Sequence, residues 1–165
     1  MHADDSPPLV IDTPRLQLVL DSTDAVLARI EAMSPADRAE VSPEWLARMR
    51  ASAPSAWTHG FTAIERATST AVGSCAFKGP PDGDGVVEIA YGIEPAHRGR
   101  GYAQEAAAAL VQFALSADTG ARRVIAHTRP ENGPSPSVLR RSGFVHVGEV
   151  VDPEDGLVWR WEFRR

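Results

Sequence analysis

The chain has 165 residues, of which 43% are hydrophobic and 24% charged, a composition typical of a globular domain that buries its own core. Its formal net charge of -5 argues against a general nucleic-acid-binding protein, and no apolar run reaches the roughly eighteen residues of a membrane span. The first residues are acidic and polar rather than a signal peptide. We therefore expect a cytoplasmic protein without nucleic-acid or membrane partners, with a flexible tail over residues 1–8 and one domain over residues 9–165.

The first half of the chain alternates between strand-like and helix-like patterns. Ser42 and Pro43 predict an N-cap and a first helical residue, while Pro and Gly crowd the expected loop at 79–85. The single cysteine, Cys75, excludes an internal disulfide and suits a small buried position in a strand. The expected elements are a strand at 15–20, helices at 23–32 and 44–51, and paired strands at 60–66 and 70–79.

Residues 86–128 predict a strand, a helix and a returning parallel strand. Successive side chains of the first strand, VVEIAYGIE, point to opposite faces, so Glu88 shares its face with an alanine and a glycine. That face leaves room for a ligand beside Glu88, and Gly92 is a natural place for a β-bulge. The helix begins at Tyr102 with apolar side chains at helical spacing, and the parallel strand follows at 122–128.

The turn between that strand and that helix predicts an anion site. The first N–H groups of a helix have no partner within it, and the helix dipole adds partial positive charge. Gly99 and Gly101 permit positive φ and close approach of a ligand, while Arg98 and Arg100 supply charged donors. Gln104 stands where a dinucleotide-binding fingerprint has its third glycine, and no P-loop sequence follows. Taken alone, the turn also fits a tight connection with two solvated arginines.

Two motifs together carry a family resemblance. The pattern Arg98-x-x-Gly101-x-Ala103 resembles the acetyl-CoA-binding motif of the GNAT superfamily of N-acetyltransferases, and ENGPSPSVLRRSGF at 131–144 resembles the superfamily's second signature. With the opening TPRLQLVL, the resemblance runs from about residue 9 to the C-terminus. It is closest to the branch that includes ribosomal-protein N-terminal acetyltransferases.

The resemblance implies an α/β fold, with a mixed, mostly antiparallel twisted sheet flanked by helices and a splayed pair of parallel strands. It implies direct transfer of an acetyl group from acetyl-CoA to a primary amine, at a protein N-terminus or on a small molecule, in a ternary complex. The pantetheine arm would lie between the splayed strands. The implied CoA-binding residues are Ile93, Glu94, Pro95, Arg98, Gly99, Arg100, Gly101, Tyr102, Ala103, Gln104 and Asn132.

The resemblance also suggests catalytic residues. Glu88 is the first choice as general base, directly or through a water, and a strand carboxylate paired with a cation is the competing interpretation. Glu94 and Glu105 are weaker candidates, and the helix dipole already explains Glu105. Leu139 stands where many relatives have a tyrosine acid, which leaves Ser135 as the acid or simply as a helix cap.

The amine acceptor follows no motif in this sequence. The residues expected near its pocket are Trp45, Trp57, His59 and His127, although a lone histidine in a strand is more often structural. The histidines show no metal-ligand spacing, so we expect no metal. A homodimer is left open. The alternatives are a catalytically weak acyl-CoA-binding or sensing module and a nucleotide-binding regulatory domain.

Overall fold

The computed structural model describes residues 8–116, 118–128, 134–153 and 156–163, and of residues 134 and 135 it describes the backbone alone. The elements in chain order are β1 (Val10–Asp12), β2 (Leu16–Leu20), α1 (Thr23–Glu31), α2 (Pro35–Ala39), α3 (Pro43–Ala51), β3 (Phe61–Glu65), β4 (Thr70–Phe77), β5 (Val86–Ile93), a 3₁₀ turn η1 (Pro95–His97), α4 (Tyr102–Ala114), β6 (Arg123–Thr128), α5 (Pro134–Arg141), β7 (Phe144–Asp152) and β8 (Gly156–Phe163).

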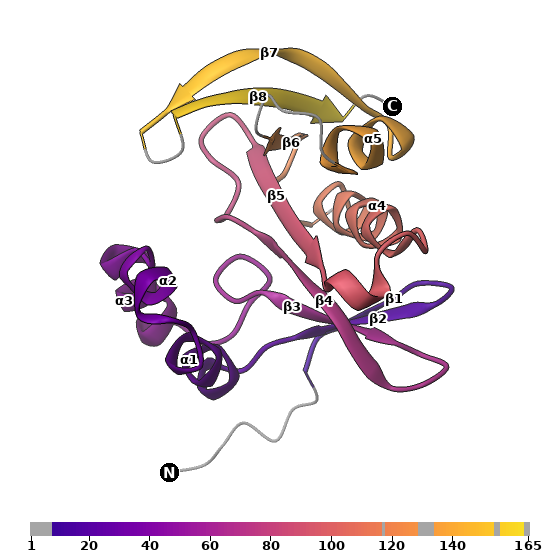
Figure 1. Ribbon diagram of the computed structural model, residues 1–165. Helices are drawn as coiled ribbons and strands as arrows, with labels where there is room; N and C mark the ends of the chain where they lie inside the picture. Colours follow the sequence, from indigo (N-terminus) through magenta and orange to yellow (C-terminus); the bar gives the residue numbers. More distant parts are fainter. Residues whose placement is uncertain (1–7, 117, 129–133, 154–155, 164–165) are drawn as a thin grey trace.

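The described strands form one sheet in the order β1-β2-β3-β4-β5-β6-β8-β7. Neighbouring strands are antiparallel except β5 and β6, which run parallel. The helices α1, α2 and α3 gather on one side of the sheet, and α4 and α5 lie on the other (Figure 1). This arrangement confirms the expected mixed, mostly antiparallel sheet flanked by helices.

The main core includes one face of α4 and the sheet residues that the helix covers. Ala106, Ala107, Leu110 and Ala114 are at most 1% exposed and belong to the same buried cluster as residues of β2 to β6. Short alanine side chains let a helix lie close to a sheet, which brings the first turn of α4 close to the end of β5. A smaller cluster joins α1 to α3 through Val26, Ile30 and Met49, the last of which is 1% exposed.

Two local features differ from the expectations. The helix α2 was not expected, although Ser34 caps it and Pro35 opens it, as Ser42 and Pro43 do for α3. The bulge expected at Gly92 is wrong, because β4 and β5 pair regularly through Ser74 and Gly92. The close approach of β4 and β5 explains the glycine at position 73, since a Cβ there would lie 2.2 Å from the Gly92 carbonyl oxygen.

Candidate active site

The site begins where β5 and β6 separate. The two strands pair only at their first positions, from Val86 to Glu88 on β5 and from Arg123 to Ile125 on β6. Beyond these positions β5 stays beside β4, and β6 stays beside β8. No described strand therefore pairs with the facing backbone edges of residues 89–93 and 126–128, and such edges offer N–H and C=O groups to a ligand.

A pocket of about 580 Å³ lies beside the end of β5, between the first turn of α4 and the helix α5. This volume is typical of a small-molecule site. Seven of the expected CoA-binding residues line it, whereas Glu94, Pro95 and Arg100 do not. Its lining consists of Tyr91, Gly92, Ile93, His97, Arg98, Gly99, Gly101, Tyr102, Ala103, Gln104, Ser137, Val138 and Arg141.

The N-terminus of α4 faces this pocket without a side-chain cap. Gly101 is its N-cap residue with φ 84°, and the first helical hydrogen bond runs from the Glu105 N–H to the Gly101 carbonyl over 3.1 Å. The N–H groups between these residues thus have no acceptor within the helix, which makes the turn suitable for an anion. Open space also lies beside Gly92, since a Cβ there would meet no atom within 4 Å.

The arginines of the turn already contact the protein. Arg98 Nε donates to the Ile93 carbonyl over 2.9 Å, and Arg100 Nη1 lies 3.7 Å from Glu65 Oε2. Hydrogen bonds from the Tyr102 and Thr68 hydroxyls hold the pKa of Glu65 below its ordinary value, so Glu65 stays charged opposite Arg100. The backbone of the turn, more than the Arg100 side chain, therefore faces the pocket.

A second pocket, of about 120 Å³, lies at the start of the gap around Glu88. Glu88 Oε2 lies 3.1 Å from Lys78 Nζ and 3.0 Å from His127 Nδ1. His127 Nε2 is buried and has no hydrogen-bond partner among the described residues. A neutral His127 that donates from Nδ1 to Glu88 would keep Nε2 as an acceptor. Tyr91 lines both pockets and so connects them.

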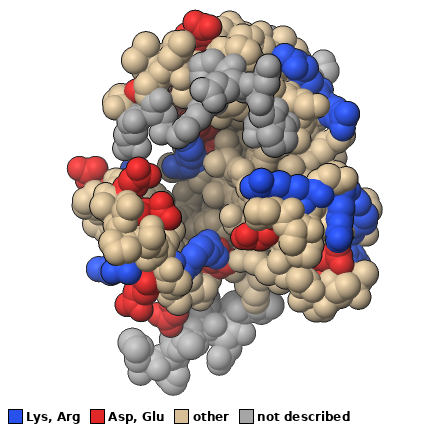
Figure 2. Space-filling model, viewed as in Figure 1, with Lys and Arg blue, Asp and Glu red and all other residues tan. Residues whose placement is uncertain are grey.

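The described surface is deeply hollowed on the face that Figure 2 presents, between the region of α1–α3 and that of the β7–β8 hairpin. Lysine, arginine and acidic side chains alternate around the rim of this hollow. A ligand that enters here meets both signs of charge.

Three of the four residues expected near the acceptor pack elsewhere. His59 is 1% exposed, and its ring nitrogens lie 2.7 Å from Thr58 Oγ1 and 2.8 Å from Thr23 Oγ1. Trp57 packs on the rings of Phe77 and Phe113 with centroid distances of 4.8 and 6.0 Å. Trp45 packs against the small cluster between α1 and α3. His127 alone of the four lines a pocket described above.

The second signature falls partly outside the described residues. Asn132 lies outside them, and Ser135 belongs to α5 but its side chain is not described. Leu139, at the position of the absent tyrosine, is fully buried and lines the pocket around Glu88. No hydroxyl therefore reaches this pocket from position 139.

Lys78 and Tyr91 were missed by the sequence analysis. Lys78 is the only lysine of the chain, a signal that could have drawn attention to it. Strand alternation placed Tyr91 on the face opposite Glu88, and it did not predict that this half-buried residue lines both pockets. Within the described ranges, no helix is long and apolar enough to cross a bilayer, and no three His, Cys, Asp or Glu side chains cluster as metal ligands.

Comparison with known families identifies the fold. A family model described as an acetyltransferase (GNAT) domain matches residues 8–145. The chain belongs to this family. Similar curated GNAT relatives include the uncharacterized N-acetyltransferase YjdG of Bacillus subtilis (strain 168), 38% identical over 74 residues, and the uncharacterized N-acetyltransferase p20 of Bacillus licheniformis, 31% identical over 94 residues. The matches cover 45% and 57% of this chain and 44% and 52% of these relatives, so the chain matches about half of their length.

Solved structures share the GNAT fold over nearly the whole chain. An acetyltransferase (GNAT family) from Bacillus anthracis is 22% identical with a TM-score of 0.69, and the match covers 94% of this chain and 98% of that one. RimL, a ribosomal L7/L12 alpha-N-protein acetyltransferase in complex with coenzyme A, is 17% identical with a TM-score of 0.69, covering 93% and 97%. AAC(6')-Ib in complex with ribostamycin and coenzyme A is 17% identical with a TM-score of 0.68, covering 92% and 94%. At these identities the likeness establishes the fold.

Proposed function

We propose that this chain transfers the acetyl group of acetyl-CoA to a primary amine, at a protein N-terminus or on a small molecule, by direct attack in a ternary complex. The observation that carries the proposal is the gap between β5 and β6, which leads from the carboxylate of Glu88 to the anion-binding turn before α4. This order of groups suits the thioester, pantetheine and diphosphate parts of one ligand. Family membership and the names of the structural neighbours support the same activity.

The residues of the pocket fit acetyl-CoA. The uncapped N–H groups of the first turn of α4, after Gly101, are proposed to hold the diphosphate. The edge of β5 that faces β6, over residues 89–93, would bind the pantetheine amides, because no described strand pairs with it there. The Ile93 carbonyl on this edge already accepts from Arg98, so the edge would bind through its other groups. We also assign Asn132 to the CoA site, since an amide can satisfy donors and acceptors together.

The chain's own residues supply the proton transfers, and bound acetyl-CoA supplies the reactive thioester. Glu88 is proposed to accept the proton of the attacking amine, directly or through a water, while Lys78 and His127 hold its Oε2 atom in place. His127 is the competing base, because its Nε2 would be a free acceptor when Nδ1 donates to Glu88. Ser135 or a water would protonate the departing thiolate.

The acceptor class is inferred from chemistry and from the neighbours. Structural neighbours are named for acetyl transfer to a ribosomal protein or to spermidine, or are bound to ribostamycin. We propose that the amine approaches Glu88 through the hollow beside α1–α3. The identity of the amine, a cytoplasmic location and a homodimer remain predictions.

A screen of amines and peptides tests the function. Purified protein is incubated with acetyl-CoA and each acceptor, and thiol release is followed together with the mass of the acceptor. Acceptor-dependent thiol release with an acetylated product supports the proposal. The buried Leu139, in place of a tyrosine acid, favours the catalytically weak acyl-CoA-binding module as the second candidate. Tight CoA binding without thiol release for any acceptor would select that candidate instead.

A further inference from the structure

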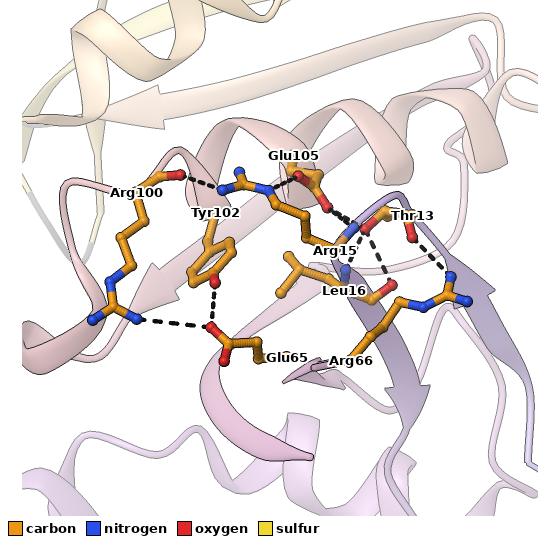
Figure 3. A network of polar contacts seen from close by, with 8 residues as sticks. All are labelled: Thr13, Arg15, Leu16, Glu65, Arg66, Arg100, Tyr102 and Glu105. Carbon is orange, nitrogen blue, oxygen red and sulfur yellow. Dashed lines mark hydrogen bonds and ion pairs between the residues drawn. The ribbon is translucent and has the colours of Figure 1, made fainter. Parts of the chain in front are cut away.

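A polar network ties the turn between β1 and β2 to the beginning of α4 (Figure 3). Arg15 lies at its centre and donates three hydrogen bonds to α4 and to the turn before it. Its backbone N–H donates to Glu105 Oε2 over 2.9 Å, its Nε donates to Glu105 Oε1 over 2.8 Å, and its Nη1 donates to the Arg100 carbonyl over 2.7 Å. Its guanidinium also lies over the Tyr102 ring, 4.6 Å from the centroid. One side chain thus joins a carboxylate of α4 to the backbone of the turn that precedes the helix.

Glu105 is held as a charged partner for Arg15. Its side chain is 14% exposed, and it also accepts a short hydrogen bond from the Thr13 hydroxyl. Burial raises the pKa of Glu105, but the hydrogen bonds from Thr13 and Arg15 outweigh burial and keep that pKa below its ordinary value. A half-buried, ionised carboxylate with its oxygens occupied fixes the position of the guanidinium better than an exposed pair does.

Tyr102 anchors the same turn from a second direction. Its hydroxyl donates a short hydrogen bond to Glu65 at the end of β3, while its ring lies under Arg15. A Cβ at Gly101 would lie 3.2 Å from Arg15 Nη2, so the guanidinium closely covers this left-handed residue. Arg15 itself does not line the pocket beside β5.

We propose that Arg15, oriented by Glu105, is a positioning residue that keeps the diphosphate-binding turn in its binding conformation. The inference rests on the proposed function for the identity of the ligand, whereas the contacts do not depend on it. Without Arg15, the Arg100 carbonyl loses its donor and the turn from Gly99 to Gly101 gains alternative conformations. A ligand must then order the turn, and the ordering cost lowers its affinity.

Three variants test the inference. Arg15→Ala removes the link, and Arg15→Lys keeps a cation that cannot bond to both Glu105 and the Arg100 carbonyl in the fork geometry of a guanidinium. Arg29→Ala is the matched control, because Arg29 also has a 2.8 Å ion pair and a side chain 46% exposed, but it binds Asp21 and lies in α1. Hydrogen exchange of the Glu105 amide, which donates to the Gly101 carbonyl, reports on the turn. Calorimetry with CoA, and with pantetheine as a ligand that lacks the diphosphate, reports on binding.

The expected results separate positioning from general stability. In Arg15→Ala the Glu105 amide exchanges about tenfold faster and the Kd for CoA rises about tenfold, while the Kd for pantetheine stays unchanged. Arg15→Lys gives an exchange rate and a Kd for CoA between those of the wild type and of Arg15→Ala, and it decides the question if the alanine variant does not fold. Arg29→Ala matches the wild type in both measurements. Unchanged exchange, or equal losses for CoA and pantetheine, would overturn the inference. Faster exchange in a protein whose wild type binds no CoA would instead refute the proposed function and leave the positioning role standing.

Discussion

At the scale of single residues, the proposed role of Glu88 rests on two neighbours that the fold brings together. Lys78 follows β4, Glu88 lies near the start of β5, and His127 lies near the end of β6. The carboxylate is 21% exposed and bridges the lysine and the histidine. These contacts fix the position of the Oε2 atom that is proposed to accept the amine proton.

Replacing Glu88 with glutamine tests the base. The amide keeps the shape of the side chain but cannot accept the amine proton, so turnover should fall roughly 10²-fold with CoA affinity unchanged. The loss should shrink at high pH, where more of the amine arrives deprotonated. Steady-state rates across a pH series check this, with Glu149→Gln on the exposed part of β7 as a control that keeps wild-type rates.

A matched change at His127 distinguishes the two candidate bases. His127→Asn can still donate to Glu88 but offers no ring nitrogen, so it should retain most of the turnover if Glu88 is the base. A loss as large as that of Glu88→Gln, with the same pH dependence, would assign the proton to His127. Wild-type turnover in Glu88→Gln at neutral pH would remove Glu88 from the mechanism.

His59 predicts a pH dependence of stability. Burial lowers its pKa below the ordinary histidine value of 6.5, although Asp21 opposes this shift. Above pH 6.5 the residue is neutral in the folded and the unfolded protein, so it does not make the free energy of unfolding depend on pH. Below pH 6.5 the unfolded chain takes up a proton that the folded chain resists, so the free energy of unfolding should fall, by at most about 1.4 kcal/mol per pH unit. Urea unfolding between pH 7.5 and 5.5 measures the slope.

His59→Gln should weaken that slope because glutamine keeps a neutral polar side chain and does not titrate. Glu105, whose pKa is lowered, loses its contribution to stability only below the ordinary glutamate value of 4.5, outside this window. Identical pH profiles for the two proteins would contradict the assignment of a neutral, buried His59.

The sequence predicted residues of the site where a backbone pattern required them. Gly101 and its neighbours were recognised because a left-handed N-cap before an uncapped helix leaves a readable motif. Trp45, Trp57 and His59 were assigned to the acceptor pocket by their region alone, and the fold packs them away from both pockets. Tertiary contacts decide whether a tryptophan faces a pocket or a core, and the residues next to it in the sequence do not reveal these contacts.

At the scale of elements, the junction of β5 and α4 combines a left-handed turn with a helix that begins without a cap. The conformation of Gly101 is needed to aim the first N–H groups at the pocket, and the link to Arg15 closes the other side of the turn. The strand, turn and helix therefore act as one binding unit, whose parts were predicted from sequence because strand alternation and helical spacing are local patterns.

Gly101→Ala tests the turn against a matched strain control. Gly101 has φ 84°, while Gly120 has φ 81° with nothing near its missing Cβ, so each alanine should cost about 1–2 kcal/mol of unfolding free energy. Calorimetry should then find CoA affinity at least about tenfold weaker in Gly101→Ala and unchanged in Gly120→Ala. Equal CoA affinities in the two variants would contradict the diphosphate assignment.

At the scale of the whole molecule, the two substrates are proposed to bind in different parts of the structure. Acetyl-CoA is proposed to lie between β5 and β6 with its diphosphate at α4, and the amine to approach through the hollow beside α1–α3 (Figures 1 and 2). The fold and the proposed CoA pocket could be predicted because the βαβ unit carries both. The acceptor could not, because the walls proposed for its pocket come from distant helices and a hairpin that follow no shared pattern.

Hydrogen exchange with and without saturating acetyl-CoA tests the central claim most directly. The account predicts slower exchange of the amides at 89–93, 99–104 and 126–128, which border the gap and the turn, with α1–α3 and β7 unchanged. These segments belong to β5, to β6 and to the turn that leads into α4, and only a ligand in the proposed position would contact all of them. No protection at saturation, or protection confined to segments outside the gap and the turn, would contradict the account.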